Sequence, residues 1–202
     1  HFGVLIKGAK PLEALARVQT LILDKTGTIT EGKPQVIRSK TFEELDRALL
    51  LGLCESSLHP ISQGVAAYLK KEDENLRPVE LTSSKQVPSR GTTGVYQGKK
   101  VLGGNAQFMK DNGVQADMES DFSLFFFAIE KRLIGYFELR DKPKAGIREL
   151  IDMCGKHKIE VVMLTGDHEE SAKTVADEVG ITHYYAGLSA EHKADFVSHQ
   201  KG

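Results

Sequence analysis

The sequence predicts an α/β protein in which a parallel, helix-covered sheet is interrupted by an inserted α+β domain. Residues 20–24 form a short apolar run that ends in an acid and precedes Thr26-Gly27-Thr28, a pattern typical of a buried strand that leads into a loop. Residues 160–164 repeat this pattern and are followed by Thr165-Gly166-Asp167. Because the two units flank a long segment of different character, we expect them to meet in space and the segment to form a second domain.

The first domain is expected to contain three helices besides these strands. Residues 144–156 follow Pro143 and place apolar side chains at helical spacing. Residues 169–179 have the same spacing and stop at Gly180, a residue type that often ends helices. Residues 190–200 predict one more helix. Alternating strands and helices are typical of a parallel sheet, so we assign residues 1–33 and 139–202 to this domain.

The inserted domain is expected to span residues 34–138. Helical patterns at residues 42–53 and 61–71 are followed by strand-like stretches near 79–87, 94–102 and 122–139. The run Phe125-Phe126-Phe127 predicts the core of a strand rather than a stacking platform. Gly32-Lys33-Pro34 and Arg140-Asp141-Lys142-Pro143 have the composition of hinges between the two domains.

The composition excludes several classes of protein. The 202 residues include 27 basic and 28 acidic side chains without long blocks of one sign, so nucleic acid is not an expected partner. Cys54 and Cys154 are isolated, which indicates a reducing compartment and argues against a metal finger. No apolar run approaches the roughly 20 residues that span a bilayer, so we expect a soluble chain. It begins with His1 and stops after a helical pattern, so we expect a piece of a longer protein.

Asp24 and the loop Thr165-Gly166-Asp167 are predicted to face one site, because both follow strands at the carboxyl edge of the sheet. A carboxylate can attack a phosphoryl group when Mg²⁺ and cationic side chains offset the charge repulsion, and an aspartyl-phosphate divides the transfer into two steps. Lys25 and Lys193 are the candidate cations. Hydroxyl and backbone N–H groups that could bind phosphate oxygens lie at Thr26, Gly27, Thr28, Thr165 and Gly166.

The segment Asp24-Lys25-Thr26-Gly27-Thr28-Ile29-Thr30 resembles the D-K-T-G-T-[LI]-T phosphorylation signature of P-type ATPases. The resemblance implies the fold of the haloacid dehalogenase superfamily, phosphorylation of Asp24, and Mg²⁺ bound by Asp24 and the Thr26 carbonyl. Thr165-Gly166-Asp167 is similar to the family's T-G-D loop, Asp141-Lys142-Pro143 to its hinge, and Lys193 to its phosphate-contacting lysine. Taken alone, Asp167 could instead cap the following helix and Lys193 could lie on a solvated face.

Residue 26 bears on the choice between a pump and a phosphatase. Phosphatases of this superfamily usually have a second Asp two positions after the nucleophile, where it acts as general acid and base. Here that position is Thr26, which cannot supply the proton. An aspartyl-phosphate should therefore persist long enough to drive a conformational change, which suits a pump.

His59-Pro60 resembles the nucleotide-binding domain of heavy-metal-transporting P-type ATPases, in which the histidine contacts adenine. Any His-Pro pair can also simply begin a helix, because Pro fits the first turn. The family has a glutamate five residues before the histidine, where this chain has Cys54 followed by Glu55. Ser89 replaces the first glycine of the family's G-x-G pair. The nucleotide contacts that we expect are Thr26, Glu55, His59, Gly91 and Gly104.

The resemblance implies the cytoplasmic nucleotide-binding and phosphorylation region of a metal-exporting ATPase, with ATP and Mg²⁺ as cofactors. Its partners would be the membrane helices and actuator domain of the parent pump and a transported ion that binds outside this chain. Copper, zinc, cadmium and cobalt all stay open. The family's G-D-G-x-N-D segment is absent, so we expect weak turnover by the chain alone and an exposed sheet edge near residues 182–186. The alternatives are a haloacid-dehalogenase-type phosphatase and a non-catalytic nucleotide-binding module.

Overall fold

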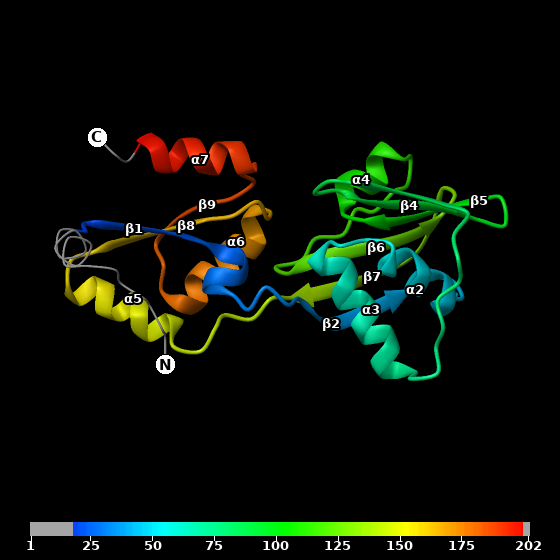
Figure 1. Ribbon diagram of the computed structural model, residues 1–202, viewed down its shortest axis with the longest axis horizontal. Helices are drawn as coiled ribbons and strands as arrows, with labels where there is room; N and C mark the ends of the chain where they lie inside the picture. Colours follow the sequence, from blue (N-terminus) through cyan, green and yellow to red (C-terminus); the bar gives the residue numbers. More distant parts are fainter. Residues whose placement is uncertain (1–17, 200–202) are drawn as a thin grey trace, which may run out of the picture. The chain divides into compact units, whose positions relative to one another are not determined.

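The computed structural model describes residues 18–199, and the chain divides into two compact units (Figure 1). Unit 2 is Thr30–Lys142, and unit 1 contains the chain on both sides of it. The sequence places these divisions at residues 33/34 and 138/139, and the structure places each of them four residues away, at 29/30 and 142/143. Residues 1–17 and 200–202, which the sequence assigns to the first domain, lie outside the described residues.

Unit 1 contains a parallel sheet with the strand order β1-β8-β9. The strands are β1 (Thr20–Asp24), β8 (Glu160–Leu164) and β9 (His183–Tyr185). The helices α5 (Ile147–Lys156) and α6 (Glu169–Val179) lie on one side of the sheet and α7 (Ala190–His199) on the other (Figure 1). The predicted parallel, helix-covered sheet is confirmed. Residues 182–186 contain β9, which is an edge strand paired with β8.

The core of unit 1 lies between the sheet and the pair α5 and α6, where Met163, Ala172 and Ala176 are fully buried. Gly180 ends α6 with φ +85°, as the sequence predicts. The helix expected from residue 144 begins instead at Ile147, because the preceding Gly146 has φ +84° and breaks the helical path.

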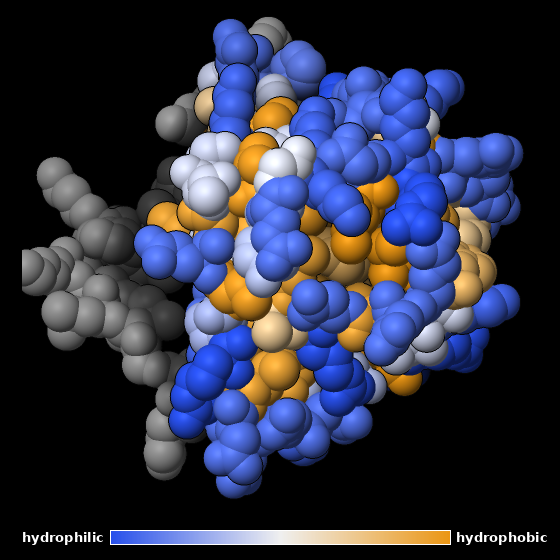
Figure 2. All heavy atoms as spheres, turned by 90° about the vertical axis from the view of Figure 1, so that its right-hand side faces the viewer, coloured by the Kyte–Doolittle hydropathy of each residue, from blue (hydrophilic) through white to orange (hydrophobic). Residues whose placement is uncertain are grey.

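Unit 2 is built on a six-stranded antiparallel sheet with the order β2-β7-β6-β5-β4-β3. Its strands are β2 (Gln35–Thr41), β3 (Ser83–Val87), β4 (Gly91–Tyr96), β5 (Lys99–Gly104), β6 (Ser123–Ile129) and β7 (Arg132–Arg140). The helices α2 (Arg47–Glu55) and α3 (Pro60–Glu72) pack on one face, and α4 (Ala106–Asp111) packs on the other. This is the α+β insertion that the sequence predicts. Figure 2 shows one face of unit 2, on which polar side chains surround apolar ones.

The three consecutive phenylalanines of β6 contribute to both faces of this sheet. Phe125 and Phe127 belong to the core beneath α2 and α3, whereas Phe126 belongs to the core beneath α4. All three are at most 2% exposed. Successive side chains of a strand point to opposite faces, which explains the division. Their interpretation as strand core is confirmed.

Two elements of unit 2 are not predicted by the sequence pattern. β2 is an edge strand whose side chains are nearly all exposed, so it lacks an apolar pattern. α4 is a short helix that begins where the Asn105 side chain accepts a hydrogen bond from the Phe108 N–H. The helix expected over residues 42–53 is α2, which begins later because Asp46 caps it by accepting from the Leu49 N–H at 2.9 Å.

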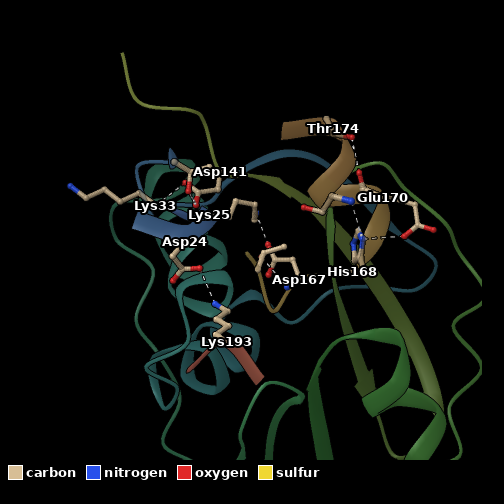
Figure 3. A network of polar contacts seen from close by, with 12 residues as sticks. Asp24, Lys25, Lys33, Asp141, Asp167, His168, Glu170, Thr174 and Lys193 are labelled. Atoms are coloured by element: carbon tan, nitrogen blue, oxygen red, sulfur yellow. Dashed lines mark hydrogen bonds and ion pairs between the residues drawn. The ribbon is translucent and has the colours of Figure 1, made fainter. Parts of the chain in front are cut away.

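The two segments that lead into and out of unit 2 are hydrogen-bonded to each other. The Glu31 N–H donates to the Lys142 carbonyl at 2.9 Å. Asp141 accepts from the Thr30 hydroxyl at 2.5 Å and from the Lys33 N–H at 3.1 Å (Figure 3). These hydrogen bonds tie together the two segments at which unit 2 begins and ends. Within residues 18–199 no helix is both long and apolar enough to cross a membrane.

Candidate functional site

The first candidate site is the loop that follows β1 in unit 1. Asp24 is the last residue of β1, and the chain then turns tightly over residues 25–29. Gly27 has φ +79°, a conformation that favours glycine because other residues clash with their own backbone there. The Lys144 ammonium donates to the Gly27 carbonyl at 2.6 Å, which holds this turn against the segment before α5.

Asp24 faces Lys193 of α7. The Lys193 ammonium lies 2.8 Å from Asp24 Oδ1, and the two side chains point toward each other (Figure 3). The Asp24 side chain is still 47% exposed, so a ligand can approach the carboxylate from solvent. Lys193 thus contacts the carboxylate and does not lie unpaired on a solvated face.

Lys25 faces Asp167 of the loop that follows β8. Its ammonium lies 2.5 Å from Asp167 Oδ2, and the lysine side chain is only 2% exposed (Figure 3). The Thr165 hydroxyl, which is buried, accepts from the Asp167 N–H at 3.1 Å and so shapes this loop. A Cβ at Gly166 would lie 3.1 Å from the Leu188 carbonyl oxygen, so this loop packs tightly against the segment before α7.

Asp167 does not cap α6. The cap is His168, whose Nδ1 accepts from the Ser171 N–H at 3.1 Å. The reading of Asp167 as a helix cap is therefore wrong, and its carboxylate binds Lys25 instead. The β1 and β8 loops lie at the same edge of the sheet because the two strands are parallel neighbours, with Asp24 opposite Leu164.

The unit 1 site offers oxygen ligands of the kind that Mg²⁺ prefers. Mg²⁺ in phosphoryl-transfer sites usually takes one or two carboxylates together with phosphate oxygens and waters. The half-exposed Asp24 carboxylate and the neighbouring Thr26 carbonyl fit such a partial ligand set. Among the described residues no group of three or more His, Cys, Asp or Glu could hold a metal ion by itself.

The second candidate site is an open cavity in unit 2, where the start of α3 meets one end of the sheet. Its lining comes from the segment before α3 and its first turn, from the end of β3 and the turn into β4, and from the ends of β5 and β6. These residues are Ser57, His59, Ile61, Ser62, Gln86, Val87, Ser89, Arg90, Gly91, Gly104, Asn105, Leu124 and Phe125.

His59 has two roles in this unit. It caps α3, because its Nδ1 accepts from the Ile61 N–H at 3.2 Å, and Pro60 is the first helical residue. The His59 N–H donates to the Ser57 hydroxyl at 3.2 Å. These bonds fix the imidazole at the cavity, which it also lines. The predicted helix start at Pro60 is confirmed. His59 both caps this helix and lines the cavity.

Gly91 and Gly104 line the cavity, but the protein itself requires them to be glycines. A Cβ at Gly104 would lie 2.4 Å from the Arg90 carbonyl, and a Cβ at Gly91 would lie 2.4 Å from the Gly103 carbonyl. The backbones of β4 and β5 thus approach each other more closely than a side chain at either glycine would permit. Ser89, which stands where the family has a glycine, adopts φ +58°, the left-handed conformation that glycine favours.

The other expected nucleotide contacts lie elsewhere. Glu55 forms an ion pair with Lys70 of α3 and is not among the residues that line the cavity. The adjacent Cys54 is buried, and burial raises the pKa of its thiol, with a smaller contribution from the Glu55 carboxylate. Thr26 belongs to the unit 1 loop. Sequence reasoning missed Arg90 and Asn105, although the Asn before α4 is a helix-start signal.

Comparisons with known proteins agree on the family and the fold. The haloacid dehalogenase-like hydrolase family matches residues 18–197. The chain is 32% identical over 208 residues to the copper-exporting P-type ATPase of Staphylococcus haemolyticus (strain JCSC1435), covering 97% of this chain and 25% of that protein. It is 33% identical over 211 residues to the copper-exporting P-type ATPase of Legionella pneumophila subsp. pneumophila (strain Philadelphia 1), covering 98% and 28%.

Among solved structures, the catalytic domain of the CPx-ATPase CopB-B, studied for conformational changes upon nucleotide binding, is similar with a TM-score of 0.76. The match has 24% identity and covers 98% of this chain and 72% of that one, which shows a shared fold. The chain spans about a quarter of the length of the two curated relatives.

Proposed function

Since this chain belongs to the haloacid dehalogenase-like hydrolases, we propose that it is the ATP-binding and phosphorylation region of a heavy-metal-transporting P-type ATPase. The observation that carries the proposal is the position of Asp24. It ends a parallel strand, stays half exposed, and has the Lys193 ammonium 2.8 Å from one of its carboxylate oxygens.

Unit 1 would perform the phosphoryl transfer. An Asp24 carboxylate oxygen attacks the γ-phosphorus of ATP, forming the aspartyl-phosphate while the bond from the γ-phosphorus to ADP breaks. Lys193 lowers the repulsion between the two anions, and Lys25 holds the Asp167 loop beside the site. Mg²⁺ bound by Asp24 and the Thr26 carbonyl would supply further charge neutralisation. No acid stands at residue 26, so hydrolysis of the acyl phosphate is slow.

Unit 2 would bind the nucleotide in the cavity beside His59. The lining combines apolar side chains that suit a base with hydroxyl, amide and cationic groups that suit its polar edges and phosphates. His59 would contact adenine. Glu55 lies outside this lining and is paired with Lys70 of α3.

In the parent pump this region would lie on the cytoplasmic face of a membrane and drive metal export. Its partners would be the membrane helices, the actuator domain and the transported ion, which binds outside this chain. Copper is the favoured ion, because the two relatives described above are named as copper-exporting.

The rival function is that of a phosphatase, which would need rapid hydrolysis of the acyl phosphate. The experiment incubates the parent pump with radiolabelled ATP and isolates the phosphorylated protein in acid. We expect an acid-stable, hydroxylamine-sensitive label that is lost in Asp24→Asn and kept in the control Asp152→Asn, an exposed acid of α5. An unchanged label in Asp24→Asn refutes the assignment. A label that turns over without ion transport favours the phosphatase.

A further inference from the structure

We propose that Arg90 binds the phosphate groups of the nucleotide and makes the unit 2 cavity selective for nucleoside di- and triphosphates over nucleosides. This inference rests on the proposed function, because it assumes that the cavity binds a nucleotide. It assigns the phosphate end of the ligand to a side chain on the turn between β3 and β4.

The charge of the cavity favours an anionic ligand. Among the residues that line it, only His59 and Arg90 can carry a positive charge, and none is acidic. A guanidinium is always protonated at physiological pH and presents a planar fork of N–H donors that matches phosphate oxygens. Arg90 therefore provides a permanent positive charge in this lining, while His59 is charged only when protonated.

The backbone fixes Arg90 in place. The Arg90 N–H donates to the Val87 carbonyl at 3.1 Å, which closes the turn between β3 and β4. Asn105 ties this turn to the start of α4, because its N–H donates to the Arg90 carbonyl at 3.0 Å and its side-chain amide donates to the Ser89 carbonyl at 3.1 Å. The base of the Arg90 side chain is thus held by two neighbouring segments of the cavity wall.

The ion pair with Asp111 orients the Arg90 side chain and leaves it able to bind a ligand. Arg90 Nη1 lies 2.8 Å from Asp111 Oδ2 of α4, and the two side chains are 44% and 48% exposed. Exposed pairs of this kind contribute little to stability, so they yield readily to a more highly charged partner. Asp111 engages one guanidinium nitrogen, which leaves other N–H donors for phosphate oxygens.

The competing explanation is that the Arg90–Asp111 pair only fastens the turn to α4. The two explanations differ in what the removal of Asp111 does. If Arg90 binds phosphate, Asp111→Ala removes a competing negative charge and keeps or raises the affinity for ADP. If the pair is only structural, Asp111→Ala weakens binding as Arg90→Ala does.

The experiment measures the affinities of adenosine, AMP, ADP and ATP for the full chain by calorimetry. We expect Arg90→Ala to lower the affinity for ADP and for ATP by about tenfold, the size typical of a lost charge-assisted hydrogen bond. The affinity for adenosine should not change. Arg90→Lys should keep part of the difference by which ADP and ATP bind more tightly than adenosine. The matched control is Arg132→Ala, because Arg132 forms a similar exposed pair with Glu43 outside the cavity.

The outcomes separate this inference from the function on which it rests. If Arg90→Ala lowers the affinities for adenosine and ADP equally, or lowers neither, Arg90 does not contact the phosphates. The cavity then remains a nucleotide site. A parallel loss in Asp111→Ala also overturns it. If the unaltered chain binds none of the four ligands, the nucleotide site itself is wrong and the inference fails with it.

Discussion

Removing the Asp167 carboxylate should destabilise unit 1 far more than removing the Asp24 carboxylate. Lys25 is 2% exposed and its ammonium lies 2.5 Å from Asp167 Oδ2, whereas Lys193 and Asp24 are 27% and 47% exposed. Breaking a fully buried ion pair by removing one partner costs about 3–5 kcal/mol. Asp167 itself is 38% exposed, so water relieves part of this cost, and we expect about 2 kcal/mol for Asp167→Asn. For Asp24→Asn we expect about 0–1 kcal/mol, the range of exposed pairs.

The measurement is hydrogen exchange read by mass spectrometry on separate peptides, because the chain has two units and a single denaturation curve would mix them. Amides of β1 and β8 should exchange with an opening free energy about 2 kcal/mol lower in Asp167→Asn. Amides of β5 and β6 in unit 2 should not change. The double variant Lys25→Met with Asp167→Asn should regain part of the loss, because the buried lysine charge is removed together with the carboxylate beside it.

Two results would refute this reasoning. An Asp24→Asn effect as large as that of Asp167→Asn would show that the Lys193 pair is as important for stability as the buried one. No effect of Asp167→Asn would show that other groups satisfy the Lys25 ammonium. The exposed Asp152→Asn substitution in α5 serves as the control for loss of an acid.

Three further predictions concern unit 2. In hydrogen exchange, Gly104→Ala should lower the opening free energy of the β4 and β5 amides by about 1–3 kcal/mol, because the new Cβ meets the Arg90 carbonyl oxygen at 2.4 Å. Gly155→Ala in α5, whose new Cβ meets no atom outside its own helix within 4 Å, should leave the exchange of unit 1 unchanged, and equal losses would contradict the packing argument. Thr92→Val should raise the opening free energy of the same β4 and β5 amides by about 1 kcal/mol, because the buried Thr92 hydroxyl has no hydrogen-bond partner among the described residues, and a decrease would reveal one. Burial raises the pKa of the Cys54 thiol, so at pH ~8 its alkylation by iodoacetamide should be slow in the folded chain and fast in urea, and rapid alkylation of the folded chain would contradict this burial.

Sequence patterns predicted those features that depend on a few neighbouring residues. The apolar runs of β1 and β8 predicted two buried strands, and the structure pairs them in parallel but buries only β8, whereas β1 is half-buried. The Phe125-Phe126-Phe127 run predicted a strand core because alternate side chains must face opposite layers. Gly180 predicted the end of α6 because helices commonly end at a residue in the left-handed conformation, which glycine adopts readily. The segment that begins at Asp24 resembles the phosphorylation signature of P-type ATPases, and this resemblance indicated the haloacid dehalogenase-like family.

The tertiary structure decided which side chains meet. Asp24 and Lys193 are 169 residues apart, and nothing local to either determines that they pair while Lys25 pairs with Asp167. Long, flexible lysine side chains bind whichever carboxylate the fold brings within reach. The turn that carries Arg90 is likewise held by Asn105, at the start of a helix that the sequence analysis did not predict. Such pairings follow from the packing of strands and helices that are distant in sequence.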